Sequence, residues 1–422
     1  MCLESSSRYG LQNKIKGEKI MKKYLKIMIA MTFLLVVLAA CGNGDNGDNG
    51  DNGETEVAAN GDNGETDDNG SNGETEGDNG ETEAAANGGN VDVNVFLIAH
   101  SPDSILDDGS FNQGAWDGIQ RFVDDNPGTQ ASFLQPHDAS DEARLDLIQD
   151  AINQGANILV LPGFHFENAL YDAQDQFPDT AFVLLDASPR RDGGDARIES
   201  NVAAIHYAEE EAGFLAGYAA VMEGYRDLGF MGGIAVPAVV RFGHGFVQGA
   251  DYAAESLGLG DGEVSINYMY LGGFAPDPAH TTTAASWFAG GTEVIFVASG
   301  GAGISVMAAA EGEDGSVIGV DVDQAHLSDS VVISAVKGLD VSVYDMLVDF
   351  SNDNFNGGDA LRFDATNDGI GLTLGSSRLS NFDLAQYDEI FGSLRDGEID
   401  VNPSLEMDDI PTNLVDLNEI GS

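Results

Sequence analysis

Residues 141–185 read DEARLDLIQDAINQGANILVLPGFHFENALYDAQDQFPDTAFVLL, and this stretch decides the fold class. Apolar side chains recur at helical spacing over residues 141–154, whereas residues 158–161 and 181–185 are apolar runs of strand length. Buried strands separated by helical segments are typical of βαβ units. The stretch therefore predicts an α/β fold with a parallel sheet flanked by helices.

The same alternation continues on both sides of this stretch. We expect further strands at residues 93–98, 228–231, 294–297, 317–320 and 331–334, and further helices at residues 112–123, 209–222 and 281–288. The chain has 422 residues, which is more than one typical domain, and two α/β units of ordinary size would use most of it. The pattern favours a body of two such units that begins near Val91.

Glycine or aspartate follows several of the expected strands. Gly163, Gly300 and Gly301 occupy such ends, and Asp321 follows the strand expected at residues 317–320. In open parallel sheets, ligands bind beyond the carboxyl ends of the strands. These positions are therefore the first place to look for a site, although each glycine alone could simply form a tight turn.

The charge of the chain excludes one class of partner. The sequence has 71 Asp and Glu against 18 Lys and Arg, which gives a formal net charge of -53. A surface of this sign repels nucleic acid and anionic membranes, and such an acidic excess usually serves solvation and suggests a salty habitat. The two cysteines, Cys2 and Cys41, precede the body, so we expect neither a disulfide nor a thiolate metal cluster there.

Residues 21–41 read MKKYLKIMIAMTFLLVVLAAC and have the order of a secretory signal. Three lysines precede the apolar residues 27–40, a run that is shorter than the about 20 residues of a membrane span. The end of this run, LAAC, resembles the bacterial lipobox. We expect residues 1–41 to be a signal and lipobox region, with Cys41 as a lipid anchor on the extracytoplasmic face of the cell membrane. An uncleaved anchor is the alternative.

Residues 42–90 repeat the unit Gly-Asp-Asn-Gly and contain 14 acidic residues and no basic ones. Val57 is the one large apolar side chain in this segment. The segment cannot bury enough surface to offset the entropy of ordering. It is predicted to be a disordered acidic linker that holds the body away from the membrane.

Lys337 is the only lysine after Lys26, while ten arginines remain in the body. A sequence that has lost lysine elsewhere retains one where its compact, flexible ammonium is needed, because the planar guanidinium of arginine has a different shape. We therefore predict that Lys337 belongs to the site. A structural ion pair or chance retention is the alternative.

Eight stretches follow one another along the body: DDGSFNQGAW at 107–116, LPGFHFENAL at 161–170, FPDTAFVLLD at 177–186, NVAAIHYAEEEAGFLAGYAA at 201–220, GGIAVPAVVRFGHGFVQGA at 232–250, EVIFVASGGAG at 293–303, VIGVDVDQ at 317–324 and VISAVKGLD at 332–340. Together they resemble the basic membrane protein family, whose best understood members are purine nucleoside receptors of ABC importers. The resemblance covers nearly the whole body and is more specific for the family than for the ligand.

The resemblance implies a two-lobed clamp of the type I periplasmic-binding-protein fold, in which each lobe is a parallel sheet flanked by helices. We expect lobe one at residues 91–204 plus 322–354 and lobe two at residues 205–321 plus 355–422. The implied function is that of a lipid-anchored solute-binding protein, not an enzyme, that captures a small polar ligand between the lobes and delivers it to an ABC transporter permease. Neither a metal nor a cofactor is expected.

Matching positions imply a site for a purine nucleoside, formed by Asp107, Asn112, Trp116, Asp186, Phe274, Gly300, Asp321 and Lys337. The two aromatic rings would stack on the base, and the amide of Asn112 would bind the base edge or the ribose. The three carboxylates and the ammonium of Lys337 would bind the ribose hydroxyls. Two alternatives remain here: Trp116 as a core residue, and Asp107 as the cap of a helix.

Three other functions are compatible with the sequence. Residues 103–108, DSILDD, are spaced like the calcium-binding aspartate cluster of nucleoside hydrolases, but Ser101 stands where the first aspartate is required. A surface adhesin or a sensory lipoprotein would have the same anchor and linker. A sugar or another heterocycle could replace the nucleoside as the ligand.

Overall fold

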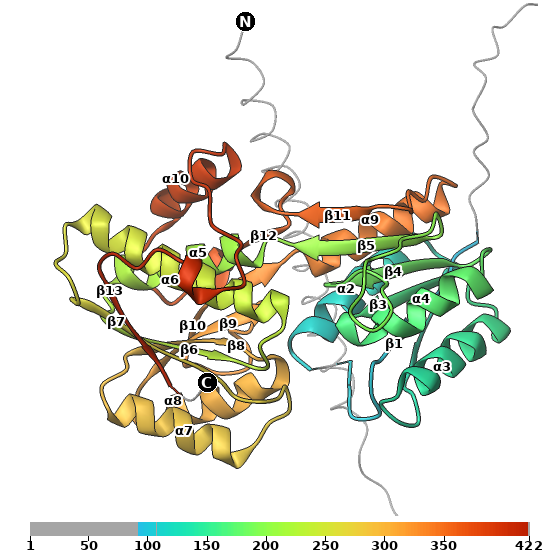
Figure 1. Cartoon of the computed structure of the whole chain (residues 1–422). Helices are drawn as coiled ribbons and strands as arrows, with labels where there is room; N and C mark the ends of the chain where they lie inside the picture. Colours follow the sequence, from blue (N-terminus) through green and yellow to red (C-terminus); the bar gives the residue numbers. More distant parts are fainter. Residues whose placement is uncertain (1–91, 107, 421–422) are drawn as a thin grey trace, which may run out of the picture. The chain divides into compact units, whose positions relative to one another are not determined.

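The computed structural model describes residues 92–106 and 108–420, which lie in one compact unit, Glu83–Ser422. The predictions for the signal region, the linker, Cys41 and Asp107 lie outside the described residues. Two sheets, each flanked by helices, make up this unit (Figure 1). The predicted α/β fold class is confirmed.

The first sheet contains six strands: β1 (Asn94–Ile98), β2 (Gln130–Leu134), β3 (Ile158–Pro162), β4 (Ala181–Leu185), β5 (Val202–Tyr207) and β11 (Ala360–Phe363). Their order is β11-β5-β4-β3-β1-β2, and all neighbours are parallel. The flanking helices are α2 (Phe111–Asp125), α3 (Asp141–Asn153), α4 (Glu167–Gln176) and α9 (Leu339–Ser351). Because side chains alternate along a strand, Val95 and Leu97 of β1 share a core cluster with α2 and α9, whereas Phe96 and Ile98 share one with α3 and α4.

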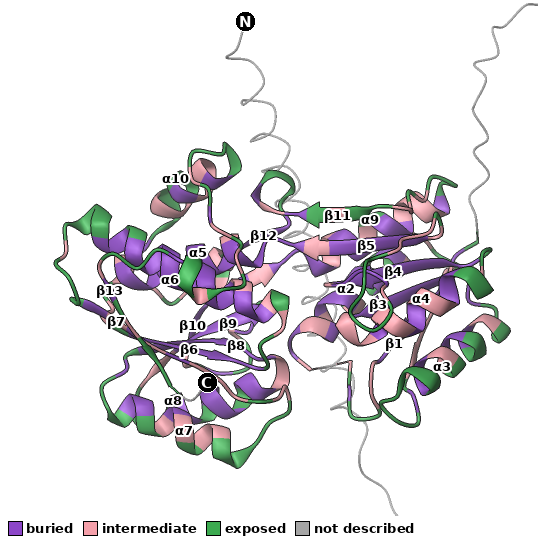
Figure 2. Cartoon of the chain, viewed as in Figure 1, coloured by how far each residue is buried: buried purple, intermediate pink, exposed green. Residues whose placement is uncertain are grey.

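The second sheet contains seven strands: β6 (Asp227–Gly232), β7 (Val264–Tyr270), β8 (Val294–Ala298), β9 (Ser316–Asp321), β10 (Val331–Lys337), β12 (Ile370–Leu372) and β13 (Val415–Glu419). Their order is β12-β10-β9-β8-β6-β7-β13, and the pair β10 and β12 is antiparallel while the other pairs are parallel. Figure 2 shows that the central strands of both sheets are buried.

Helices cover both faces of the second sheet as well. They are α5 (Glu209–Glu223), α6 (Pro237–Leu257), α7 (Pro278–Ala289), α8 (Gly303–Glu313) and, further along the chain, α10 (Leu384–Arg395). Helices α7 and α8 share a core cluster with one face, and α5 and α6 share a cluster with the other. The backbones of α5 and α6 approach closely because α6 carries glycine at the contact: a Cβ on Gly249 would lie 1.9 Å from the carbonyl oxygen of Phe214.

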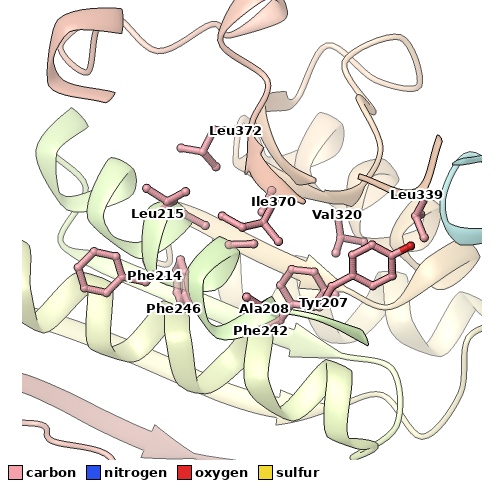
Figure 3. Packing of buried hydrophobic residues seen from close by; sticks show 14 of the residues in the cluster. Tyr207, Ala208, Phe214, Leu215, Phe242, Phe246, Val320, Leu339, Ile370 and Leu372 are labelled. Atoms are coloured by element: carbon pink, nitrogen blue, oxygen red, sulfur yellow. The ribbon is translucent and has the colours of Figure 1, made fainter. Parts of the chain in front are cut away.

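The chain crosses between the sheets three times: at Ala208 after β5, at Gly338 after β10, and at residues 364–369 after β11. Helix α9 follows the second crossing and packs on α2 of the first sheet. Figure 3 shows apolar side chains near these crossings, among them Tyr207, Phe242 and Leu339. We call residues 92–207 and 339–363 the first lobe, and residues 209–337 and 370–420 the second lobe.

These strand pairings correct the expected lobe boundaries. Strand β10 pairs with β9 in the second sheet, against the expectation that residues 322–354 belong to lobe one. Strand β11 pairs with β5 in the first sheet, against the expectation that residues 355–422 belong to lobe two, and β5 itself runs past residue 204 to Tyr207. For β10 the physical reason is that an apolar run indicates a buried strand but does not specify which strand it hydrogen-bonds to. For β11 the sequence gives no strand signal, because Ala360 and Arg362 are exposed.

Candidate functional site

The last residue of β10, Lys337, is the centre of a buried charge cluster at the junction of the two lobes. Its ammonium lies 2.5 Å from Oδ2 of Asp186, which follows β4 of the first lobe, and 3.2 Å from Oε1 of Glu209, which begins α5 of the second lobe. Lys337 is 5% exposed and Glu209 is 1% exposed. Two of the predicted site residues, Asp186 and Lys337, are thus brought together, and Glu209 joins them.

The carboxylates around Lys337 keep its ammonium charged despite its burial. Burial alone would lower the pKa of Lys337, but Asp186, Glu209 and Asp321 raise that pKa well above its ordinary value. Burial raises the pKa of each of these three carboxyl groups, and Lys337 opposes the rise. The cluster therefore holds more carboxyl groups than cations, which suits a ligand that donates hydrogen bonds.

Aromatic rings from both lobes surround the same ammonium. The Nζ atom of Lys337 lies 5.0 Å from the ring centroid of Phe111, 5.3 Å from that of Tyr207 and 5.3 Å from that of Phe242. Phe111 begins α2, Tyr207 ends β5, and Phe242 belongs to α6. The electron-rich faces of these rings attract a cation, so they help to hold Lys337 in place.

One carboxylate oxygen of Asp186 receives no hydrogen bond from an N–H or O–H group. Its Oδ2 accepts a hydrogen bond from Lys337, whereas its Oδ1 is buried and has no donor among the described residues, although the carboxyl of Glu209 lies within hydrogen-bonding reach of Asp186. The residue has φ +59, a left-handed conformation that aspartate tolerates better than most residues do. A buried acceptor without a partner costs roughly 1–3 kcal/mol, and a ligand hydroxyl would remove that cost.

Asp321, the last residue of β9, joins the lobes by a second contact. Its Oδ2 accepts a 2.5 Å hydrogen bond from the hydroxyl of Ser110, which directly precedes α2 in the first lobe. Asp321 also has a positive φ, +67. Asp321 and Lys337 both line a pocket of about 340 Å³ whose other walls include Gly338, Asp340 and Asp368 near the crossings.

The two other predicted residues of α2 have different surroundings. Asn112 is buried, and its side-chain amide donates to the carbonyl of Ile105 at 3.2 Å. Trp116 is half-buried and packs against the main core cluster, as its alternative interpretation as a core residue requires. Phe111, five positions earlier at the start of α2, is the aromatic residue of this helix that faces Lys337.

The carboxylate of Asp108 binds backbone groups at the start of α2. Asp107 lies outside the described residues, but the carboxylate of Asp108 accepts hydrogen bonds from the backbone N–H groups of Ser110, Asn112 and Gln113 at 2.9, 3.1 and 3.1 Å. These bonds satisfy donors that the first turn of a helix leaves free. Burial raises the pKa of Asp108 to about 6.

Phe274 and Gly300 lie together at the carboxyl ends of β6 and β8 in the second lobe. Gly300 has φ +55, and a Cβ there would lie 3.8 Å from Phe274. A Cβ on Gly233, which follows β6, would lie 2.3 Å from the Phe274 ring, so this glycine makes room for the ring. The hydroxyl of Ser299 is buried beside Gly300 and has no partner within the described part of the chain.

Sequence reasoning missed Glu209, Phe111 and Arg241. Nη1 of Arg241, on α6, lies 3.5 Å from Oε2 of Glu209. Glu209 is the first of three glutamates at the start of α5. Acidic residues are common at this end of a helix because they interact favourably with the helix dipole, so the sequence does not show that Glu209 forms a buried ion pair. Phe111 did carry a signal, because it begins the apolar stripe of α2 that continues through Ala115.

This arrangement combines acceptors, one ammonium and aromatic faces, which together suit a neutral ligand with hydroxyl groups and a flat ring. Within residues 92–106 and 108–420, no group of three or more His, Cys, Asp or Glu side chains is arranged to hold a metal ion.

Known proteins resemble most of the described chain. Residues 95–400 match the family described as ABC transporter substrate-binding protein, PnrA-like. The chain is 28% identical over 291 residues to the ABC transporter nucleoside-binding protein BmpA of Lactococcus lactis subsp. cremoris, covering 64% of this chain and 78% of that protein. It is 27% identical over 313 residues to basic membrane protein D of Borreliella burgdorferi, covering 71% of this chain and 84% of that protein.

Solved structures show the same fold. An ABC transporter solute-binding protein from Conexibacter woesei superposes with a TM-score of 0.60 at 22% identity, covering 74% of this chain and 99% of that one. A solute-binding protein from Aeropyrum pernix K1 superposes with a TM-score of 0.58 at 23% identity, covering 75% of this chain and 90% of that one. The two-lobed type I periplasmic-binding-protein fold is thereby confirmed.

Proposed function

Because the chain belongs to the PnrA-like family of ABC transporter substrate-binding proteins, we propose that it captures a purine nucleoside between its lobes and delivers it to a permease. The family consists of binding proteins, so the chain is not an enzyme. The Lactococcus relative is named a nucleoside-binding protein, which supports a nucleoside as the ligand class.

The observation that carries this proposal is the unpartnered Oδ1 of Asp186 beside the buried ammonium of Lys337. A buried acceptor next to a fixed donor matches two neighbouring hydroxyls, each of which can donate and accept. Ribose presents such a pair. Because Asp186 belongs to the first lobe and Lys337 to the second, a ribose bound by both would hold the lobes together.

The flat base would bind to aromatic rings. We assign stacking to Phe111 in the first lobe and to Phe274 in the second, with Trp116 supporting the helix that carries Phe111 and Asn112. Stacking of this kind contributes roughly 1 to 3 kcal/mol per base in other proteins. Asp321, and Asp107 as expected from the sequence, would add acceptors for the sugar.

We also propose that Cys41 carries a lipid that holds the protein at the extracytoplasmic face of the cell membrane. The support is the LAAC sequence after an apolar run of signal length. In the described part of the chain, no helix combines the length and hydropathy that a membrane crossing needs. Mass spectrometry of the membrane fraction should find the lipid on Cys41. Unmodified Cys41, or a protein that retains residues 27–40, would contradict the anchor.

Isothermal titration calorimetry on the detergent-solubilised full chain tests the ligand class. Inosine, guanosine and adenosine are compared with free ribose, other sugars and the free bases. We expect at least one nucleoside to bind far more tightly than its base or its sugar alone, because the site has partners for both parts. Tight binding of a sugar with no binding of any nucleoside would contradict the proposal. Mass spectrometry of material that co-purifies with the protein gives an independent identification.

A further inference from the structure

We propose that Glu209 is a positioning residue that holds the ammonium of Lys337 in the ligand site from within the second lobe. This inference rests on the proposed function, because it assigns a ligand contact to Lys337. Glu209 does not need to touch the ligand itself. Its effect passes through Lys337.

The two carboxylate partners of Lys337 differ in the lobe that supplies them. Asp186 lies 2.5 Å from Nζ and belongs to the first lobe, so this ion pair spans the junction. Glu209 lies 3.2 Å from Nζ and begins α5, which packs against β10 in the second lobe that also carries Lys337. A relative movement of the lobes therefore changes the first ion pair and preserves the second.

Burial makes this second partner necessary. The side chain of Lys337 is 2% exposed, and a buried ammonium without a carboxylate is strongly destabilising. If the lobes separate to admit a ligand, Glu209 is the acidic partner that remains within 4 Å in the same lobe. It therefore keeps Lys337 charged and oriented while Asp186 is free to exchange partners with a ligand.

The charged and titratable groups that face Glu209 come from five elements besides its own helix. Lys337 comes from β10, Arg241 from α6, His206 and Tyr207 from β5, Asp321 from β9, and Asp186 from the end of β4. Arg241 lies 3.5 Å from Oε2, on the opposite carboxylate oxygen from Lys337. Glu209 is thus held from two sides, which fixes the oxygen that Lys337 contacts.

The next residue supplies a matched control. Glu210 is also 1% exposed and lies in the same first turn of α5. Its carboxylate accepts a 2.7 Å hydrogen bond from Arg362, whose side chain is 49% exposed, and it makes no ion pair with Lys337. Replacing Glu210 by Gln therefore disturbs a buried glutamate of the same helix without disturbing Lys337.

Binding of inosine, guanosine and adenosine is measured by calorimetry on the full chain and on Glu209→Gln and Glu210→Gln. We expect Glu209→Gln to weaken binding about tenfold or more, because the hydrogen bond that the ammonium of Lys337 donates to the ligand is lost or misplaced. Glu210→Gln should bind each nucleoside within about twofold of the parent affinity. Substitutions that contact neither the ligand nor Lys337 change the affinity by no more than this. Equal weakening in both variants, or unchanged affinity in Glu209→Gln, overturns the inference.

A second measurement needs no ligand. Lys337 is the only lysine after Lys26, so its Nζ resonance in a protein with ¹⁵N-labelled lysine is identified by its disappearance in Lys337→Met. The resonance should shift in Glu209→Gln and keep its position in Glu210→Gln. If the parent binds none of the three nucleosides, the proposed function fails, and this spectrum still decides the inference. An unshifted Nζ resonance in Glu209→Gln overturns it.

Discussion

Acidic residues on the surface and at the lobe junction are the same chemical groups in opposite environments. Asp172 on the surface pairs with Arg191, and the two side chains are 39% and 53% exposed. At the junction, the side chains of Asp186 and Glu209 are 12% and 1% exposed around Lys337. Exposed pairs are worth about 0–1 kcal/mol, whereas breaking a buried pair costs about 3–5 kcal/mol. The net charge of -53 therefore reflects exposed acidic residues that interact with water. The acidic residues of the candidate site differ from them in being shielded from water.

The largest expected effect is that of Lys337→Met at the junction. At neutral pH the free energy of unfolding should fall by about 3–5 kcal/mol, because Asp186 and Glu209 lose their shared cation. Chemical denaturation measures the change. The loss should shrink in acid, where protonated carboxyl groups no longer repel each other. An unchanged denaturation midpoint at pH 7 would show that the buried cluster is not coupled to stability.

The next effect concerns Asp108, a half-buried carboxyl beside the first turn of α2, whose pKa is raised by burial to about 6 from 3.8. A raised pKa means that the folded state binds the proton more tightly. The stabilisation is present below about pH 4 and is lost as the pH rises through about 6. The difference in unfolding free energy between the parent and Asp108→Asn should change by up to about 3 kcal/mol over this range. A difference that stays constant from pH 4 to pH 7 would show that the pKa of Asp108 is not raised in the folded protein.

Asp186→Asn tests the available carboxylate oxygen. We expect nucleoside affinity to fall roughly tenfold, because the charged acceptor for a ribose hydroxyl is replaced by a neutral amide. Calorimetry measures the affinity, and Asp179→Asn, at an exposed turn after α4, is the control. If both variants bind like the parent, Asp186 does not contact the ligand.

The smallest effect belongs to the surface pair. Arg191→Ala should change the free energy of unfolding by less than about 1 kcal/mol, and by still less at high salt, because water and ions screen the exposed pair. Denaturation in low and high salt measures this. A loss as large as that of Lys337→Met would remove the contrast between surface and junction.

The fold class and three of the buried charged residues were accessible from the sequence. Apolar runs with intervening helical stretches predict buried parallel strands, and Asp186, Asp321 and Lys337 all lie where such strands end. The partner of β10 was not accessible, because its apolar run shows burial but not its hydrogen-bonded neighbour. Strand β11 itself was not predicted, because its residues ALRF alternate in exposure and form no buried apolar run.

Side-chain direction accounts for the remaining differences. Phe111 and Trp116 are five positions apart on α2, so at about 100° per residue they point to different faces of the helix. The apolar stripe through Ala115 and Ile119 orients α2 so that Phe111 faces the junction. The contact between Glu209 and Lys337 joins residues far apart in the sequence, and no local pattern predicts it.

A structure of the full chain in complex with the tightest-binding nucleoside tests most directly whether the lobe junction is a nucleoside site. We expect Nζ of Lys337 and Oδ1 of Asp186 to lie at hydrogen-bonding distance, about 2.6–3.2 Å, from ribose hydroxyls, with the base against Phe111. A nucleoside bound elsewhere, with Oδ1 of Asp186 still lacking a partner, would contradict a nucleoside site at the lobe junction.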